Sequence, residues 1–190
     1  MTATGRIHLF AFACATLLSG CATTRVDIAP STPANLCQPI GREETALVLW
    51  RTQWRPDQKD VLERVQAADA GIRRFFTTST CYTRASVRRV DTLAEPEQST
   101  DLLVQESQAD VLVALKIKEL GPVVKILASP SLVEGFTEVV FDLSVQRRGV
   151  PEGAGEYSVH WTNGGPGVVR GTASLPNDMH DALAAAFFAH

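Results

Sequence analysis

The sequence predicts one mixed α/β (α+β) domain, in which a mixed sheet of about five strands carries helices mainly on one face. Two observations predict it: several stretches alternate apolar and polar side chains as half-buried strands do, and one long stretch carries an apolar stripe at helical spacing. The predicted order is β-α-β-α-β-β-β-α. The chain has 190 residues, 45% hydrophobic and 21% charged, an ordinary globular composition with room for one such domain.

The first half of the domain is predicted to form a strand, a helix and a second strand. Ala46–Trp54 is rich in apolar and aromatic residues and is the first strand, and Thr83–Val90 is a second, shorter one. Between them Pro56 suits a helix start, and the helix is predicted over 57–76. Its apolar stripe recurs every three or four residues, at Val61, Val65, Ala68 and Ile72. Gly71 lowers the helix propensity near its end.

The second half is predicted to hold a helix, three strands and a closing helix, at 100–108, 110–120, 138–146, 156–162 and 177–189. The strand at 110–120 carries apolar side chains on both faces, so we expect it to be central in the sheet. In the next two strands apolar and polar residues alternate strictly, which predicts one buried and one solvent-exposed face for each strand. Asn177 or Asp178 is the expected cap of the last helix.

The N-terminal segment differs in character from the rest of the chain. Ile7–Leu18 is a run of twelve mostly apolar residues that follows the single positive charge of Arg6. A membrane span needs about 20 apolar residues, so this run is typical of a signal-peptide core. We therefore predict a signal peptide over residues 1–20. A buried N-terminal helix is the alternative.

The residues that end this segment are Leu18-Ser19-Gly20-Cys21. They resemble the lipobox of bacterial lipoproteins, an aliphatic residue and two small residues before a cysteine. The resemblance implies that Cys21 carries a diacylglycerol and an N-acyl chain, with no other cofactor. Ala22 in place of aspartate implies the outer membrane of a Gram-negative envelope, facing the periplasm. An ordinary secretory signal with a chance cysteine is the alternative.

Residues 21–41 are predicted to be a lipid-anchored tether, since they contain three prolines and no apolar periodicity. The domain proper is predicted over 42–190. Cys14 would leave with the signal peptide, so Cys37 and Cys81 remain as one pair in an oxidising compartment. Each precedes a predicted strand, and neighbouring parallel strands would bring both to the same end of the sheet. This predicts a disulfide, with two unrelated buried thiols as the alternative.

We predict no catalytic residue and no metal site. Asp178, His180 and Asp181 suit a helix N-terminus, and no distant His or Cys completes a ligand set. Ser158 and His160 share a strand face but lack a nucleophile turn and a third orienting group. The glycine-rich stretch 163–167 follows a strand and opens no helix, which predicts a turn. Three tryptophans are expected in the core and not in a ligand platform: Trp50, Trp54 and Trp161.

Charge is unevenly placed along the chain. The net charge of −3 excludes a basic excess for nucleic acid. Residues 42–90 hold ten basic and six acidic side chains, and residues 91–190 hold six basic and fourteen acidic ones. Five arginines are candidates for a basic surface that would meet anionic glycan or lipid head groups: Arg73, Arg74, Arg84, Arg88 and Arg89. Pairing between the two halves of the chain is the alternative.

The stretch 121–135 is apolar, contains Pro122 and Pro130, and is predicted to be a loop. If the loop projects, its apolar side chains form a partner-binding or membrane-facing patch. If it packs back, they belong to the core. The candidate contact residues are Val123, Val124, Ile126, Leu127, Leu132 and Val133.

The element order and the run Gln108-Ala109-Asp110-Val111-Leu112-Val113, a helix end that enters a central strand, resemble auxiliary lipoproteins of envelope machines. These include the penicillin-binding-protein activators and the curli-secretion lipoprotein. The resemblance implies a non-catalytic auxiliary or adaptor that is held to the membrane by its lipid and binds an envelope protein. A periplasmic lipid- or glycan-binding module is the alternative, and a hydrolase is the least favoured hypothesis. The oligomeric state is not predicted.

Overall fold

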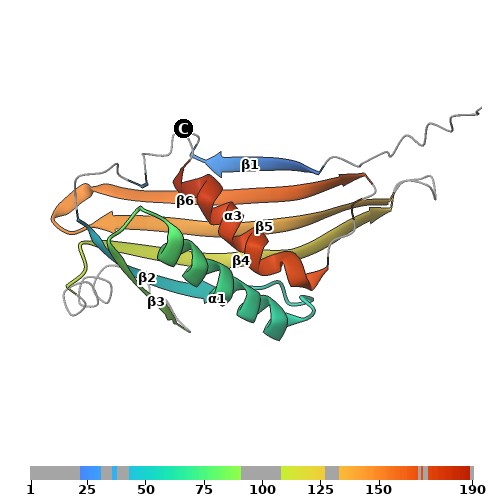
Figure 1. The fold of residues 1–190 in the computed structure, drawn as a ribbon, viewed down its shortest axis with the longest axis horizontal. Helices are drawn as coiled ribbons and strands as arrows, with labels where there is room; N and C mark the ends of the chain where they lie inside the picture. Colours follow the sequence, from blue (N-terminus) through green and yellow to red (C-terminus); the bar gives the residue numbers. More distant parts are fainter. Residues whose placement is uncertain are drawn as a thin grey trace, which may run out of the picture.

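A computed structural model describes residues 22–30, 36–37, 43–90, 108–126, 133–166, 168 and 171–188. In these residues one mixed sheet of six strands has the order β1-β6-β5-β4-β2-β3, and two α-helices lie on one of its faces (Figure 1). The predicted fold class is confirmed, with one strand more than expected. No described helix is long and apolar enough to cross a membrane.

The elements follow one another as strand, strand, helix, four strands in which the last three are long, a short 3-10 turn and a closing helix. Their bounds are β1 Thr23–Ala29, β2 Thr45–Thr52, α1 Val61–Thr78, β3 Arg84–Arg89, β4 Val111–Ile126, β5 Val133–Arg147, β6 Val150–Pro166, η1 Thr172–Ser174 and α3 Leu175–Phe187. The helix predicted at 100–108 falls almost wholly outside the described residues.

The sheet combines a parallel part and an antiparallel part. β2 pairs in parallel with both β3 and β4, and α1 makes the crossover that a parallel β2–β3 pair requires. β4, β5 and β6 then form an antiparallel meander. The prediction that 110–120 is central is confirmed, because β4 lies between β5 and β2.

The core fills the space between the sheet and the two helices. Alternate residues of the strands point toward α1 and α3, and the large side chains Trp50, Phe141 and Trp161 are at most 1% exposed. Burying each such side chain contributes roughly 1.5–3 kcal/mol or more. Trp54 is partly buried against the same cluster. The prediction that the tryptophans belong to the core is therefore confirmed for Trp50 and Trp161, and Trp54 lies at its edge.

The helices start at other residues than predicted. α1 begins at Val61 and not at residue 57, because the chain first makes a turn. In this turn the backbone N–H of Gln58 donates to the backbone carbonyl of Arg55. α3 begins at Leu175, with Pro176 in its first turn, where a missing N–H costs nothing. Its N-cap is Ser174. The predicted caps at 177 and 178 therefore lie inside the helix.

The tether prediction was wrong for residues 23–29. They form β1, an edge strand that pairs antiparallel with β6 from Thr23 opposite Gly164 to Ala29 opposite Ser158. Most of its side chains are exposed, and only Ile28 packs against the core. The stretch shows no clear apolar pattern because an edge strand is held mainly by backbone hydrogen bonds. The folded domain therefore extends closer to Cys21 than predicted.

Two predicted connections are strands. The predicted loop 121–135 is largely the hairpin of β4 and β5, which pair as far as Ile126 opposite Val133, and only 127–132 lies outside the described residues. The predicted turn at 163–167 continues β6 to Pro166. A Cβ on Gly164 would overlap the Gly135 carbonyl and the Phe136 backbone. The glycine therefore marks a close approach of β6 to β5 and not a turn.

Gly71 has a similar role between the helices. A Cβ at this position would lie 2.6 Å from the Pro176 carbonyl oxygen and 2.7 Å from the Met179 Cβ. Gly71→Ala is expected to destabilise the protein by about 1–2 kcal/mol, because overpacking outweighs the gain of about 1 kcal/mol in helix propensity. Urea unfolding measures the change. Ala70→Gly, at a neighbouring exposed position, reports the propensity term alone, and a more stable Gly71→Ala protein would contradict the expected close contact.

The predicted disulfide is confirmed. Cys37 and Cys81 are bonded, with their Cα atoms 4.8 Å apart. Cys37 precedes β2 and Cys81 precedes β3, and these strands are parallel neighbours, so both cysteines lie at the same end of the sheet.

Removing this disulfide is expected to lower the free energy of unfolding by about 2–4 kcal/mol, because the unfolded chain regains the entropy of a closed loop. The double variant Cys37→Ala/Cys81→Ala and the parent are compared by urea unfolding, with and without reductant. Reductant should destabilise the parent alone. Equal midpoints for the oxidised parent and the double variant would contradict a stabilising bond.

Candidate functional site on the open face of the sheet

The open face is the side of the sheet opposite α1 and α3. Alternation along the strands places there one residue in two, including Lys116 on β4, Asp142 on β5 and Ser158 on β6. The predicted wet faces of the strands at 138–146 and 156–162 are thus confirmed. Toward the β2 end this face turns apolar, with a small buried cluster of Leu47, Leu49, Ala109 and Leu112.

Charge on the open face is divided between two groups of strands. The basic half lies on β3, β2 and β4 and contains Arg51, Arg84, Arg88, Lys116 and Lys118. The acidic half lies on β1, β5 and β6 and contains Asp27, Glu138, Asp142 and Glu156, with Arg25 as the one arginine among its described side chains. The two halves meet between β4 and β5. A surface divided in this way favours a partner whose charges are placed in the opposite sense.

The boundary between the halves is held by one carboxylate between two ammonium groups. Asp142 lies 2.7 Å from Lys116 Nζ and 2.6 Å from Lys118 Nζ. Burial alone would raise the pKa of Asp142, but hydrogen bonds from the two lysines and their charges outweigh it and hold the pKa below its usual value. Its contribution to stability is therefore present above the ordinary aspartate pKa of about 4 and is lost as the pH falls through the lowered value.

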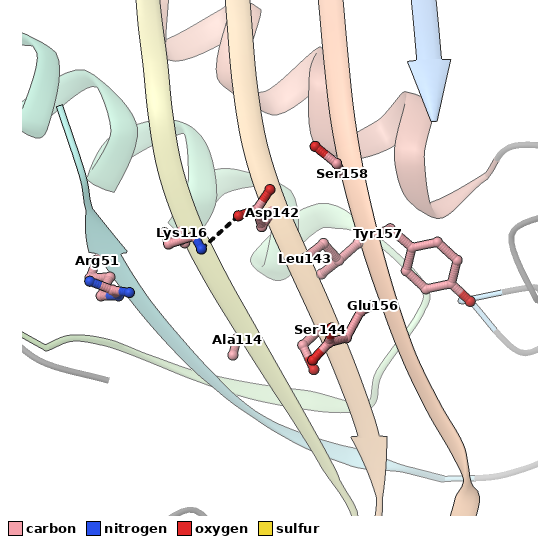
Figure 2. A pocket seen from close by; sticks show the side chains of 9 residues that line it. All are labelled: Arg51, Ala114, Lys116, Asp142, Leu143, Ser144, Glu156, Tyr157 and Ser158. Carbon is pink, nitrogen blue, oxygen red and sulfur yellow. Dashed lines mark ion pairs between the residues drawn. The ribbon is translucent and has the colours of Figure 1, made fainter. Parts of the chain in front are cut away.

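A hollow of about 390 Å³, here called the central hollow, lies over this boundary. It is lined by Arg51, Ala114, Lys116, Asp142, Leu143, Ser144, Glu156, Tyr157 and Ser158 (Figure 2). In Figure 2 Lys116 and Asp142 point toward one another across two neighbouring strands. Tyr157 is only 6% exposed, and its ring points away from these polar groups. The polar groups of the hollow are therefore basic, acidic and hydroxyl side chains.

A second hollow of about 360 Å³ lies near β1, and its lining includes Arg25, Asp27, Val123, Glu138 and His160. His160 Nε2 and Glu138 Oε1 are 2.7 Å apart. Val123 is half-buried here, as the one candidate of the predicted apolar patch whose side chain the structure describes. The side chains of 124, 126 and 133 and all of 127 and 132 lie outside the described part.

The structure does not gather the other candidate groups into a site. No hydrogen bond joins Ser158 to His160 within the described part of the chain, and the two side chains line different hollows. Asp178 is buried on α3 and accepts from Ser174 Oγ at 2.7 Å. His180 Nδ1 lies 2.9 Å from Asp181 Oδ1. Among the residues that the structure describes, no group of three His, Cys, Asp or Glu side chains is placed to hold a metal ion.

Three of the five arginines proposed as a basic surface have neighbours within the fold. Arg73 pairs with Asp69 at 2.7 Å, Arg74 donates to Asn177 Oδ1, and the Arg89 guanidinium lies 5.6 Å from the centre of the Trp50 ring. Arg84 and Arg88 are exposed. Internal contacts thus account for most of this cluster, although Asp69 lies in the same half of the sequence as its partner.

The sequence analysis missed Arg51, Lys116 and Asp142 as site residues. The alternation of the β4 sequence already put Lys116 and Lys118 on the face opposite the core side chains. Nothing local to either strand indicated that Asp142 would lie between them, because that depends on the register of β4 against β5.

Neither a protein-family model nor a curated protein sequence matches this chain. Among solved structures, the PelC dodecamer from Paraburkholderia phytofirmans is similar over 87% of this chain and 97% of that one, with 13% identity and a TM-score of 0.44. An L103M variant of that dodecamer covers 87% and 98%, with 10% identity and a TM-score of 0.45. A homolog of the neuraminyllactose-binding hemagglutinin from Helicobacter pylori covers 78% and 87%, with 10% identity and a TM-score of 0.36. At these values the likeness does not indicate a function.

Proposed function

We propose that this protein is a lipid-anchored outer-membrane lipoprotein that faces the periplasm and acts without catalysis. Its role is that of an auxiliary or adaptor, and its open face binds a protein partner of the envelope. The single observation that carries the binding role is the division of the open face into a basic and an acidic half.

The location is supported by sequence and by covalent structure. The lipobox-like residues Leu18–Cys21, which lie outside the described part, end an apolar run of signal-peptide length. The Cys37–Cys81 disulfide suits an oxidising compartment such as the periplasm. A domain that begins with β1 at Thr23 would lie close to the membrane surface if Cys21 is acylated.

The non-catalytic role is supported by the way in which the polar groups of the open face are used. Asp142 is held by Lys116 and Lys118, and Glu138 pairs with His160. Charged groups arranged in pairs over a broad face steer and orient a partner, and they add specificity more than raw affinity. Recognition is therefore the use that this arrangement suits best.

Charge reversal on the open face tests the proposal. Lys116→Glu/Lys118→Glu is expected to reduce crosslinking to the envelope partner at least about tenfold, because like charges across an interface are costly. Arg73→Glu, an exposed site on α1, is the matched control and should capture the same protein as the parent. The captured protein is then purified and titrated against all three proteins at two salt concentrations.

The expected result is salt-dependent binding that the parent and Arg73→Glu share and the double variant lacks. Circular dichroism verifies that the double variant is folded. Identical partner sets and affinities for all three proteins would remove the open face from the proposed function.

A further inference from the structure

We propose that the central hollow is a carboxylate-binding site, in which Arg51 and Lys116 together hold an acidic side chain of the protein partner. This inference rests on the proposed function and specifies the chemistry of the partner at one point of the open face.

The first observation is the register of β2 against β4. Arg51 and Lys116 are direct cross-strand partners in this parallel pair, and both line the central hollow. Like charges directly opposite each other destabilise a sheet. The fold therefore places two cations together where an anion from outside would relieve their repulsion.

The second observation is that the nearby carboxylate is already engaged. Asp142 is shared by two lysines at 2.6 and 2.7 Å, so this trio keeps one excess positive charge. Glu156 lies on β6, three strands away from Arg51 in the order β6-β5-β4-β2. At about 4.8 Å for each strand spacing, that separation is about 14 Å, too far for an ion pair. Neither acid neutralises Arg51.

The third observation is the state of the Arg51 side chain. Its Nε is buried and has no hydrogen-bond partner among the described residues, and none of the ion pairs among them includes Arg51. A buried donor without a partner costs about 1–3 kcal/mol. A guanidinium presents a planar fork that matches a carboxylate with two parallel hydrogen bonds. A ligand carboxylate would satisfy this donor.

The hollow also defines which anion suits it. Two cations and two carboxylates line the hollow, and Lys118 pairs with Asp142 without lining it. Together these five groups leave a single positive charge, which one carboxylate neutralises and a phosphate dianion exceeds. The hydroxyls of Ser144 and Ser158 also line the hollow and can donate to a carboxylate oxygen. With about 390 Å³ and an open side, the hollow has room for the end of a Glu or Asp side chain.

The test titrates the full-length protein, purified in detergent, with a hexaglutamate peptide as the probe. Binding is followed by calorimetry and by the NMR signal of the Arg51 Nε–H group. Arg51→Gln is expected to weaken binding at least tenfold and Arg51→Lys to restore part of it. Arg73→Gln, which removes an exposed cation on α1 and not on the open face, should change the affinity less than twofold.

Stability separates a binding role from a structural one. Arg51 Nε has no hydrogen-bond partner among the described residues, and no ion pair among them includes Arg51, so Arg51→Gln should leave the midpoint of thermal unfolding unchanged or raise it. A lowered midpoint would show that Arg51 supports the fold and would count against the site.

Three results would overturn the carboxylate site. One is equal weakening by Arg51→Gln and Arg73→Gln, which indicates a diffuse charge effect. Another is tighter binding of inorganic phosphate or of glucuronate than of hexaglutamate, which assigns the hollow to another anion or to an acidic sugar. The last is unchanged crosslinking of the partner by Arg51→Gln while Lys116→Glu/Lys118→Glu still abolishes it. In that case the proposed function stands and the inference alone fails.

Discussion

Replacing Arg64 with methionine is expected to lower the free energy of unfolding by about 3 kcal/mol, since it leaves a buried carboxylate without its buried partner. The Arg64 and Glu119 side chains are 9% and 10% exposed and lie 3.1 Å apart. Arg64 also donates from Nε to the Lys59 carbonyl at 2.8 Å and from a terminal nitrogen to the Leu120 carbonyl. Arg55 contacts Glu119 from the solvent side at 2.9 Å. Because Glu119 would keep this partner, the expected loss of stability lies at the low end of the range for buried pairs.

Urea unfolding of three proteins tests this prediction. Arg64→Met should be strongly destabilised, and Arg64→Met/Glu119→Met should recover most of the loss, because two apolar side chains leave no buried charge. Arg73→Met, which breaks an exposed pair on the same helix, should cost about 0.3–0.5 kcal/mol. A double variant as unstable as Arg64→Met would show that the hydrogen bonds to the backbone, and not the unpaired carboxylate, dominate.

Gly121 belongs to the same arrangement. A Cβ at this position would overlap the guanidinium of Arg64, which is held in place by Glu119 and Leu120. The glycine of the predicted loop therefore sits in β4 to give the buried arginine its space. The sequence alone did not predict this packing role of Gly121.

Replacing Cys21 with alanine is expected to move the protein almost entirely from the membrane fraction to the soluble periplasmic fraction. A single acyl chain holds a protein only marginally, at about 10⁴ M⁻¹, and two or three chains give a stable anchor. The variant chain is exported behind a conventional secretory signal in place of residues 1–20, so that loss of processing does not retain it. Fractionation and mass spectrometry of the N-terminal peptide measure the outcome.

Cys14→Ala, made in the chain that keeps its own residues 1–20, controls for the loss of a cysteine from this segment, because it leaves the lipobox-like residues intact. It should remain membrane-bound and acylated. Retention of the Cys21→Ala protein in the membrane, or an N-terminal peptide of unmodified mass from the parent, would contradict the lipid anchor. The open-face variants should fractionate like the parent, which separates anchoring from partner binding.

Much of the fold could be predicted because its signals are local. Strict alternation in β5 and β6 defines their two faces. The predicted stripe of α1 is confirmed in part, because Ala68 and Ile72 are buried and Val65 packs against the core, whereas Val61 is exposed. The strand ends could not be predicted in this way. Pro122 and Gly164 looked like loop residues, yet β4, β5 and β6 pair beyond them because each strand supplies hydrogen bonds to the next.

Two other features depended even more on distant pairing: the buried ion pair and the edge strand β1. Arg64 is a charged residue on the buried side of α1, and its burial is explained by Glu119, 55 residues away in the sequence. Similarly, β1 could be recognised only through its partner β6, since its own side chains are mostly exposed.

The sequence by itself determined which faces of the strands are apolar, and where the two domain cysteines stand relative to β2 and β3, because both are set by positions along the chain. It also contains the lipobox-like targeting residues 18–21. The tertiary structure alone decided that Arg51 lies opposite Lys116 and that Asp142 lies between two lysines. Strand order and register follow from long-range packing and backbone hydrogen bonding, which no local periodicity encodes.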